Sequence, residues 1–296
     1  MELLVQVIVY SVMLGGFYAL MSQGLAISYG VLRFPNLAHG GLVICGAYTN
    51  WLLSGAFGLD GLLVIPLTVA IGYPVGCLVA SLLLVPLLEK THFVQLLVSL
   101  GLALFIESSL ILAFSAQAAR IESPLSDYVF RYGWLNIRGT QLLMLGSSIV
   151  LIGILVAVLR WSQFGKMMRA TSDDIQAAVV VGLPVRSVFT RSFAIGTMIC
   201  FAAGAIMGID QAFVPGMGML LTLKAFVIVV VGGSSKVTGT IVAALTLALI
   251  EIATATYVPG IGSGVGIVAG VVLLAVMLWL KPEGLLNKAT ERAQAA

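Results

Sequence analysis

Long apolar runs, separated by short polar or glycine- and proline-containing interruptions, fill almost the whole chain. The runs lie at about 4–29, 40–55, 61–88, 93–116, 140–160, 189–212, 217–232, 238–256 and 263–280. A helix needs roughly 17–25 apolar residues to cross a bilayer, so most of these runs are long enough to span one. The pattern predicts an all-α polytopic membrane protein with about nine transmembrane segments.

Two runs, 40–55 and 217–232, are shorter than the others and are bounded by Gly or Pro. Such short, interrupted segments are typical of broken or half helices in transporters, and we expect one or both to be of this kind. The chain starts with Glu2 and lacks a basic stretch there. Residues 4–29 are therefore expected to be a first span and not a cleaved signal peptide.

The composition supports a membrane location. Hydrophobic residues make up 60% of the chain and charged residues 9%, against roughly 25% charged in soluble domains. No basic tract is interleaved with aromatic residues, so nucleic acid is not an expected partner. Cys45, Cys77 and Cys200 all lie in apolar runs without a CxxC pair. We expect them to be small core residues and not a disulfide framework or a metal site.

The distribution of Lys and Arg predicts the orientation. If the basic interruption 160–191 is cytoplasmic and every run crosses, eleven of the fifteen Lys and Arg residues lie in the cytoplasm and three lie outside. This asymmetry agrees with the positive-inside rule, and it places the N-terminus outside and the C-terminus in the cytoplasm. The outer loop 117–140 is then either a solvated loop with an aromatic belt or a docking surface for a soluble partner.

A short helix is predicted within the basic interruption, at Asp173–Val181. Thr171 or Ser172 is a suitable N-cap, and Gly182 followed by Pro184 is a stop signal. Apolar residues lie on every side of this helix: Ile175, Ala177, Ala178, Val179, Val180 and Val181. A helix that is apolar all round needs cover from outside its own membrane domain, so we predict that it docks into a partner protein.

Two breaks interrupt apolar runs without bringing much charge. The first, 30–41, contains Pro35, which disfavours helix before it, and Asn36, a natural N-cap for a helix starting near His39. The second, 231–239, has Gly232, Gly233, Ser234 and Ser235 ahead of a helix. Such breaks either aim helix N-termini at a substrate or gate, or are tight connections between neighbouring helices.

Four ionisable residues lie inside predicted spans: Glu107, Asp210, Lys224 and Glu251. Glu251 and Asp210 lie near predicted outer ends, where hydration is the simpler expectation. Glu107 lies deeper and is expected to form an ion pair or to line a pathway. His39 is expected either to pack between helices with its hydrogen bonds satisfied or to bind a substrate.

Sequence signatures of enzymes are missing. The chain has no GxxxxGK[ST], HExxH or GxSxG segment, and its two histidines lack metal-ligand spacing. We therefore expect neither an enzyme activity nor a metal or cofactor in this chain.

Three segments in order carry a family resemblance: GVLRFPNLAHG at 30–40 with GAY at 46–48, RATSDDIQAAVVVGLPV at 169–185, and AFVIVVVGGSSKVTGTIVAALTLALIE at 225–251. With the spacing of the runs they resemble the LIV-type permeases of bacterial ABC importers for branched-chain amino acids, and more distantly the ribose-type sugar permeases. The resemblance implies one multi-pass permease domain over 1–296 in the inner membrane. It also implies a cytoplasmic coupling loop at 161–188 and a periplasmic loop at 117–140.

The resemblance also implies roles for particular residues. Those expected to couple the chain to an ATPase are Arg169, Ala170, Asp173, Asp174, Ala178 and Gly182. Those expected to line the translocation path are Asn36, His39, Gly40, Gly232, Gly233 and Ser234, together with Glu107. Pro35, Leu37 and Gly41 depart from the usual family pattern, which affects the expected substrate more than the fold.

The function implied is that of a transmembrane permease subunit of an ATP-driven importer. Its partners would be two ABC ATPase subunits, which use the ATP, a second homologous permease and a periplasmic substrate-binding protein. The substrate would be a branched-chain or other hydrophobic amino acid, or alternatively an amide, urea or an aromatic acid. The alternative class is a stand-alone secondary transporter or channel, which would need an ion site or a proton relay in the membrane.

Overall fold

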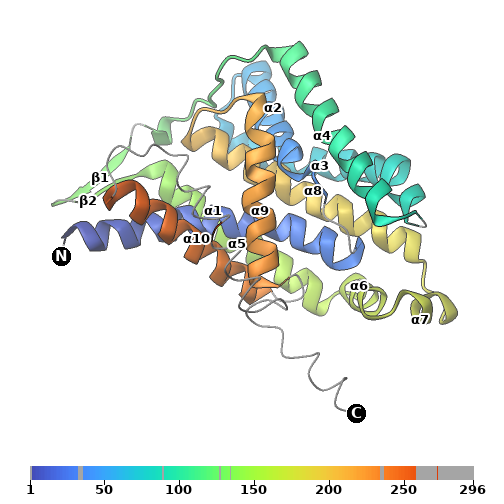
Figure 1. Cartoon of the computed structure of the whole chain (residues 1–296). Helices are drawn as coiled ribbons and strands as arrows, with labels where there is room; N and C mark the ends of the chain where they lie inside the picture. The colour runs from blue at the N-terminus through green and yellow to red at the C-terminus, as the bar shows by residue number, and fades with distance from the viewer. Residues whose placement is uncertain are drawn as a thin grey trace, which may run out of the picture.

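The computed structural model describes residues 2–32, 36–88, 90–126, 128–133, 135–233, 237–257 and 272, and it is almost entirely helical there (Figure 1). The helices are α1 (Glu2–Leu32), α2 (His39–Phe57), α3 (Gly61–Val79), α4 (His92–Phe114), α5 (Gly139–Trp161), α6 (Gln163–Asp173), α7 (Ile175–Val180), α8 (Val185–Asp210), α9 (Gly218–Gly232) and α10 (Val237–Tyr257). A π-helical turn, Ala80–Leu84, and a 3₁₀ turn, Val85–Leu87, continue α3, and a further 3₁₀ turn, Pro215–Met217, precedes α9.

The predicted apolar runs correspond closely to these helices. The first eight runs coincide with α1, α2, α3 and its continuation, α4, α5, α8, α9 and α10. Seven of the described helices are long and apolar enough to cross a membrane, and α2 is not one of them. The ninth predicted run, 263–280, lies outside the described residues. The helical nature of the first eight runs is confirmed, and the number of crossings stays a prediction.

The central helix is α8. Within the most apolar stretch of 18 residues in α8, 89% of the residues are buried. In the corresponding stretches of α4 and α5 the share is 17%. A helix that is apolar on all sides is stable only when neighbours cover all sides, and α8 contacts α1, α2, α3 and α5. Phe193 and Phe201 of α8 are among the largest fully buried side chains. The helices α3, α4 and α5 instead expose apolar side chains, as lipid-facing helices do.

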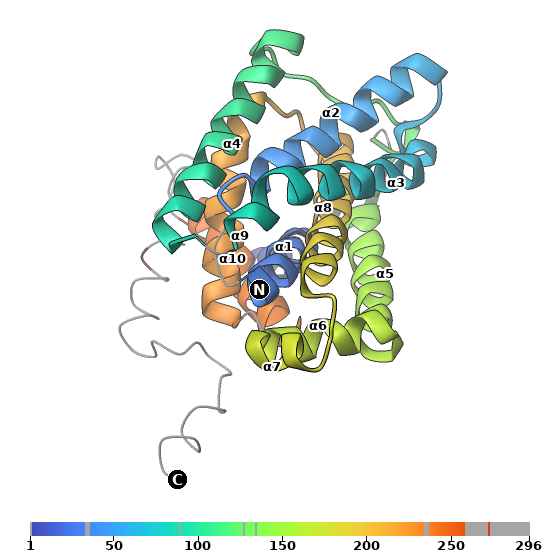
Figure 2. The same cartoon turned by 90° about the vertical axis from the view of Figure 1, so that its right-hand side faces the viewer.

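Around this centre α1 packs against α5, α8 and α10, while α9 crosses in front of α1 and α10 at a steep angle (Figure 1). Thus α1, the first helix of the chain, contacts both of the last two described helices, α9 and α10. Figure 2 shows α9 and α10 together on one flank of the bundle and α5 on the opposite flank.

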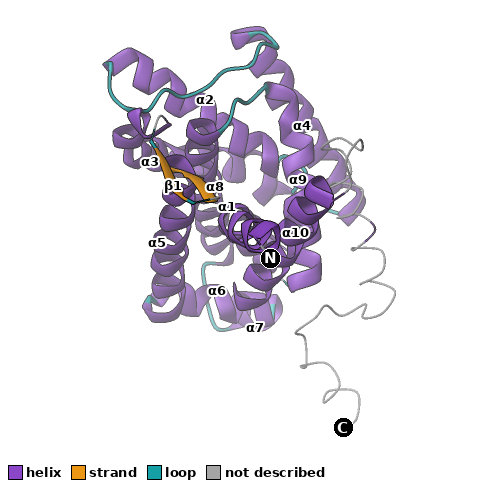
Figure 3. Ribbon diagram, turned by 90° about the vertical axis from the view of Figure 1, so that its left-hand side faces the viewer, coloured by secondary structure: helices purple, strands orange, loops and turns teal. Residues whose placement is uncertain are grey.

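A β-hairpin lies at the end of the bundle where α1 begins, which we call the hairpin end (Figure 3). Its strands, β1 (Val129–Tyr132) and β2 (Leu135–Arg138), are antiparallel, with Val129 opposite Arg138. The Tyr10 hydroxyl of α1 donates a hydrogen bond of 2.6 Å to the Asn136 carbonyl. The loop predicted at 117–140 is therefore partly ordered into strands and is bound to α1.

The opposite end of the bundle carries α6 and α7, and we call it the α7 end (Figure 1). Helix α6 was not predicted. It begins at the N-cap Ser162, whose hydroxyl accepts a hydrogen bond from the Gly165 amide (3.0 Å), and it contacts α1, α5 and α8. The Ser172 hydroxyl of α6 donates to the Gly30 carbonyl near the end of α1 (2.7 Å). The connection from α5 to α8 is thus a folded unit and not an extended loop.

Candidate functional site

The short helix predicted at the α7 end is present, with a different start. Helix α7 begins after Asp174, whose carboxylate accepts hydrogen bonds from the amides of Gln176 (2.8 Å) and Ala177 (3.0 Å). The predicted N-caps, Thr171 and Ser172, are wrong because both residues lie inside α6. Asp174 ends α6 because its extended backbone, with φ −147°, leaves the helical region, and its carboxylate then caps the amides that follow.

The end of α7 follows the predicted stop signal. Gly182 has φ +83°, a left-handed conformation that favours glycine. Its amide donates to the Val179 carbonyl, and the Leu183 amide donates to the Ala178 carbonyl, both at 3.0 Å. These bonds satisfy carbonyls that the helix end would otherwise leave free.

The surface of α7 is apolar and uncovered. Ala178 is its one buried residue and is 4% exposed, whereas Val179, Val180 and Val181 are 58%, 86% and 79% exposed. The neighbouring Ala170 is exposed, and the Arg169 guanidinium donates to the Leu159 carbonyl of its own chain. Three adjacent exposed valines at one end of the bundle are typical of a surface that another protein covers.

The first break places the start of α2 deep within the bundle. The Asn36 side-chain oxygen accepts a hydrogen bond from the Ala38 amide (3.1 Å). The Asn36 backbone carbonyl accepts one from the His39 backbone amide (3.3 Å). The Gly40 amide donates to the Thr222 hydroxyl of α9 (2.8 Å). The predicted N-cap Asn36 is wrong, because Ala38 holds that position and Asn36 forms a local turn before it. Thr222, which sequence reasoning missed, caps the helix from across the bundle.

His39 is buried at 2% exposure between three helices. Its Nε2 lies 3.1 Å from the Met21 carbonyl of α1, and its Nδ1 lies 3.3 Å from the Cys200 sulfur of α8. Of the two expectations for this residue, the contacts favour packing between helices. All three cysteines are free thiols, as expected, and Cys200 is the buried one.

The second break is a close crossing of α9 and α10. A Cβ at Gly232 would lie 2.6 Å from the Gly239 carbonyl carbon, so only glycine fits there. The Gln23 side chain of α1 donates to the Thr240 hydroxyl just after the break. Gly233 has φ +79°, and Ser234 lies outside the described residues. Helix α9 thus contacts the first break near its start and the second break at its end.

An ion pair joins α9, α10 and α1 between these breaks. Lys224 Nζ lies 2.8 Å and 3.0 Å from the two carboxylate oxygens of Glu251. The Tyr18 hydroxyl donates to the same carboxylate (2.7 Å) and accepts a hydrogen bond from Lys224. The expectation that Glu251 is simply hydrated is therefore wrong, because its carboxylate is held by a lysine and a tyrosine.

The other two ionisable residues lie nearer the hairpin end. The Asp210 carboxylate accepts a hydrogen bond from the Thr140 hydroxyl of α5, so protein contacts and not hydration alone satisfy it. Glu107 of α4 points toward the turn before α9, where its Oε1 would lie 3.4 Å from a Cβ at Gly216. Its predicted role in the pathway stays a prediction.

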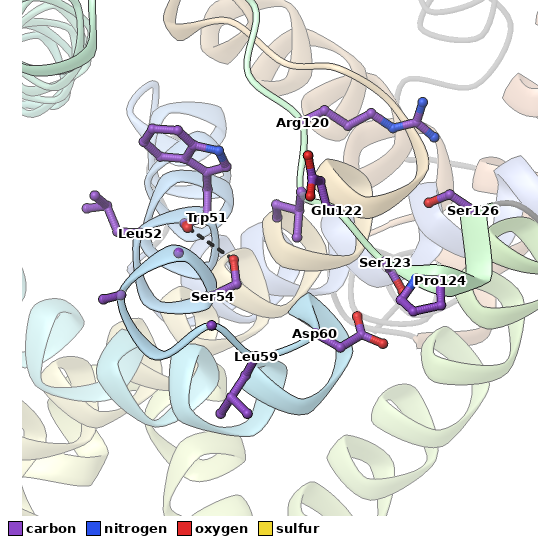
Figure 4. Close-up of a pocket in the computed structure, with 14 residues that line it drawn as sticks. Trp51, Leu52, Ser54, Leu59, Asp60, Arg120, Glu122, Ser123, Pro124 and Ser126 are labelled. Carbon is purple, nitrogen blue, oxygen red and sulfur yellow. Dashed lines mark hydrogen bonds between the residues drawn. The ribbon is translucent and has the colours of Figure 1, made fainter.

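A hollow of about 1170 Å³ opens at the hairpin end, between the α2–α3 loop and the segment 120–126 (Figure 4). Trp51 lies on one side of it, and Arg120 and Glu122 lie on the other. The Trp51 ring contacts the rings of Tyr48 and Phe114 edge-on, and those two rings stack with centroids 4.6 Å apart. The hollow thus has an aromatic ring on one side and charged groups on the other. Among the described residues, no cluster of His, Cys, Asp or Glu could hold a metal ion.

These features define a polytopic α-helical membrane protein with buried helix breaks and an uncovered apolar helix at one end. The chain belongs to the family of branched-chain amino acid transport system permease components, whose sequence profile matches residues 7–279.

Individual relatives agree over nearly the full length. The chain is 24% identical over 297 residues to the high-affinity branched-chain amino acid transport system permease protein BraD of Pseudomonas aeruginosa, covering 96% of this chain and 95% of BraD. It is 23% identical over 295 residues to the corresponding permease protein LivH of Escherichia coli K12, covering 94% and 93%. The solved structure of PsaBC from Streptococcus pneumoniae, in complex with Fab, has a similar fold, with a TM-score of 0.51, 13% identity, and coverage of 96% and 93%.

Proposed function

We propose that the chain is the transmembrane permease subunit of an ATP-driven importer for branched-chain or other hydrophobic amino acids in the bacterial inner membrane. Two ABC ATPase subunits hydrolyse the ATP, so the chain itself is not an enzyme and holds no cofactor. A second homologous permease completes the passage, and a periplasmic binding protein delivers the substrate. The family assignment and the names of the full-length relatives support this function.

The observation that carries the proposal is the uncovered surface of α7. The exposed side chains of Val179 and Val180, and of Val181 directly after the helix, would each gain from burial in an apolar groove, at roughly 25 cal/mol for each Å² removed from water. In helix-in-groove docking of this kind, the groove of the partner protein binds the apolar side chains of a rigid helix. Asp174 at the start of α7 and Gly182 at its end hold the helix in one shape, so a partner that grips it moves a defined element.

The contacts of α7 provide a route for the movement. Helix α8 begins directly after α7, at Val185, and runs through the centre of the bundle. Helix α6, directly before α7, is bound to α1 through Ser172 and Gly30. A push on α7 therefore acts on α1 and α8, which both contact His39 at the first break. Binding of ATP would shift the population between outward- and inward-facing states through these helices.

The proposed orientation has about nine crossings, with the α7 end in the cytoplasm and the hairpin end in the periplasm. The N-terminus is then outside and the C-terminus inside. Loop 161–188 meets the ATPase, and loop 117–140 with the hollow beside Trp51 meets the binding protein. The excess of Lys and Arg on the α7 side supports this arrangement.

The test uses Val180→Glu, with Gln176→Glu on the same helix as the matched control. Both residues are exposed, so neither change should disturb the fold. We expect Val180→Glu to reduce co-purification of the ATPase subunits and ATP-driven leucine uptake at least tenfold, and Gln176→Glu to leave both within twofold. Equal co-purification and uptake with both variants would remove α7 as the docking element. Uptake of acetamide or urea without leucine would replace the proposed substrate class.

A cysteine placed at Gln176 tests the orientation separately. It should react with a membrane-impermeant maleimide in inside-out vesicles and not in intact spheroplasts. The opposite labelling pattern would place α7 outside and overturn the coupling role.

A further inference from the structure

In the cluster of Lys224, Glu251 and Tyr18, the lysine and the tyrosine lie near the middle of their helices, and the glutamate lies in the second half of α10. Tyr18 is sixteen residues from the start of α1 and fourteen from its end, so it lies about 21–24 Å along the helix axis from either end. Lys224 is close to the centre of α9, and Glu251 is fourteen residues from the start of α10 and six from its end. Substrate sites of membrane transporters commonly lie near the bilayer midplane, between elements that can move relative to each other.

Stability alone does not explain an ion pair at this position. A charged side chain is unfavourable near the bilayer centre even when it is paired. Replacing a buried ion pair by apolar residues of similar size is often neutral or stabilising, so the pair is weak evidence for a structural role. Three apolar residues would join α1, α9 and α10 equally well, and a pair of charges at their crossing points to a function.

The pair is also less enclosed than the polar groups close to it. The side chains of Lys224 and Glu251 are 11% and 19% exposed. Ser22 and Gln23, one turn further along α1 from Tyr18, are 0% and 1% exposed. The two charged side chains are therefore partly uncovered in this chain, whereas the neighbouring hydrogen bonds are sealed within the bundle.

We propose that Lys224 and Glu251 form a transit site for the charged backbone of an α-amino acid, which rests on the proposed importer function. The substrate carboxylate binds Lys224 in place of Glu251, and the substrate ammonium binds Glu251 in place of Lys224. The protein pair and the zwitterion both have zero net charge. No unpaired charge is therefore left in the membrane in either the empty or the occupied site.

Tyr18 is the positioning residue of this site. Its hydroxyl bonds both charged groups, and Lys224 Nζ lies 4.9 Å from the centre of its ring. When the ion pair opens, the hydroxyl still holds the Glu251 carboxylate and the ring still attracts the Lys224 ammonium. An amide or urea carries neither charge and cannot separate the pair, so this site selects amino acids over neutral solutes.

Two variants in the complete importer, reconstituted in liposomes with its ATPases and binding protein, test the proposal. Glu251→Gln keeps the shape and can still accept from Tyr18. The double variant Lys224→Met with Glu251→Leu removes both charges together. We expect each to assemble and to hydrolyse ATP within twofold of the wild type, with ATP-driven uptake of radiolabelled leucine at least tenfold lower.

Thr246→Val on α10 is the matched control, because the Thr246 hydroxyl bonds only the Val242 carbonyl of its own helix. It should leave uptake within twofold of the wild type. Wild-type leucine uptake by an assembled Glu251→Gln or double variant would overturn the transit site and leave the importer function intact. Failure of both variants to assemble would assign the pair to folding and also overturn the transit site.

The wild-type complex separates this inference from the function on which it rests. Binding-protein- and ATP-dependent leucine uptake by the wild type is the expected result. Its absence would overturn the proposed amino acid import, and the transit site with it, before any variant is compared.

Discussion

The hydroxyl of Thr222 accepts a hydrogen bond of 2.8 Å from the backbone amide of Gly40, although the two residues are 182 positions apart. The same hydroxyl lies within hydrogen-bond distance of the carbonyls of Leu37 and Gly218, each at 3.1 Å. A side chain of α9 thus caps the N-terminus of α2 inside the bundle, where no water would otherwise accept a hydrogen bond from the free amide. The contact joins the first break to the helix that leads to the second.

Gly40→Ala should disrupt this junction. A Cβ at position 40 would lie 1.9 Å from the Gly218 carbonyl oxygen and 2.7 Å from the Thr222 amide nitrogen, both backbone atoms that cannot turn away. We expect a loss of about 1–3 kcal/mol of stability, as for other overpacked sites, and a lower melting temperature of the purified protein.

Gly55→Ala in the same helix is its control, because nothing lies within 4 Å of a Cβ there. That change should be neutral, or stabilising by roughly 0.5–1 kcal/mol. Equal melting temperatures for the two variants would contradict the close approach of α2 and α9.

Thr222→Val keeps the size of the side chain and removes the cap. The Gly40 amide would lose its hydrogen-bond acceptor, at a cost of about 1–3 kcal/mol for a buried group left unsatisfied. Thermal unfolding in detergent measures the loss. Thr246→Val should change the melting temperature far less, since its hydroxyl bonds only its own helix. A Thr222→Val protein as stable as the Thr246→Val protein would show that the cap contributes nothing.

Gly182→Ala should loosen the end of α7 without any steric clash. No atom lies within 4 Å of a Cβ at Gly182, so the cost comes only from φ +83° and is roughly 1–2 kcal/mol. Hydrogen exchange of the amides at 174–183 should become about 5–30-fold faster. Gly182→Asn should have a smaller effect, because asparagine tolerates this conformation better. Unchanged exchange in the alanine variant would argue against the left-handed turn.

Asp174→Ala removes the carboxylate that caps α7. The amides of Gln176 and Ala177 lose their acceptor, which costs about 0.5–2 kcal/mol of helix stability. In the assembled importer we expect fewer leucine molecules imported for each ATP hydrolysed, because a frayed α7 transmits less movement. Asp174→Asn still caps the helix and should stay close to the wild type. Identical ratios in the alanine and asparagine variants would separate the cap from coupling.

The positions of the long helices could be predicted from the sequence, because lipid requires long apolar segments and the backbone must satisfy itself within them. The predicted runs 93–116 and 140–160, for example, correspond to His92–Phe114 and Gly139–Trp161. Local signals were also sufficient for the end of α7, where only Gly182 needs a left-handed backbone.

The start of α7 was not predictable in the same way. Thr171, Ser172, Asp173 and Asp174 are all acceptable N-caps by residue type. The choice of Asp174 depends on α6, and α6 is stabilised in part by the contact of Ser172 with Gly30 of α1. Helix α6 itself is too polar to show the long apolar run that identified the other helices, and its own signal is the amphipathic spacing of Phe164, Met167 and Met168.

The pairing of Lys224 with Glu251 and Tyr18 was missed for a related reason. Glu251 is 27 positions from Lys224 and Tyr18 is 206 positions from it. The hydropathy of each run does not indicate which helices cross. A signal was present nonetheless. One lysine and one glutamate lie in consecutive apolar runs, and opposite charges in neighbouring spans favour pairing in lipid.

The bond between Tyr10 and the Asn136 carbonyl has a consequence for biosynthesis, because the two residues are 126 positions apart. At a synthesis rate of roughly 5–20 residues per second, Asn136 leaves the ribosome about 6–25 s after Tyr10. During that interval α1 can already be inserted, yet nothing from the hairpin holds its first turns. The first turns of α1 therefore gain this hydrogen bond only after the chain has reached the start of α5.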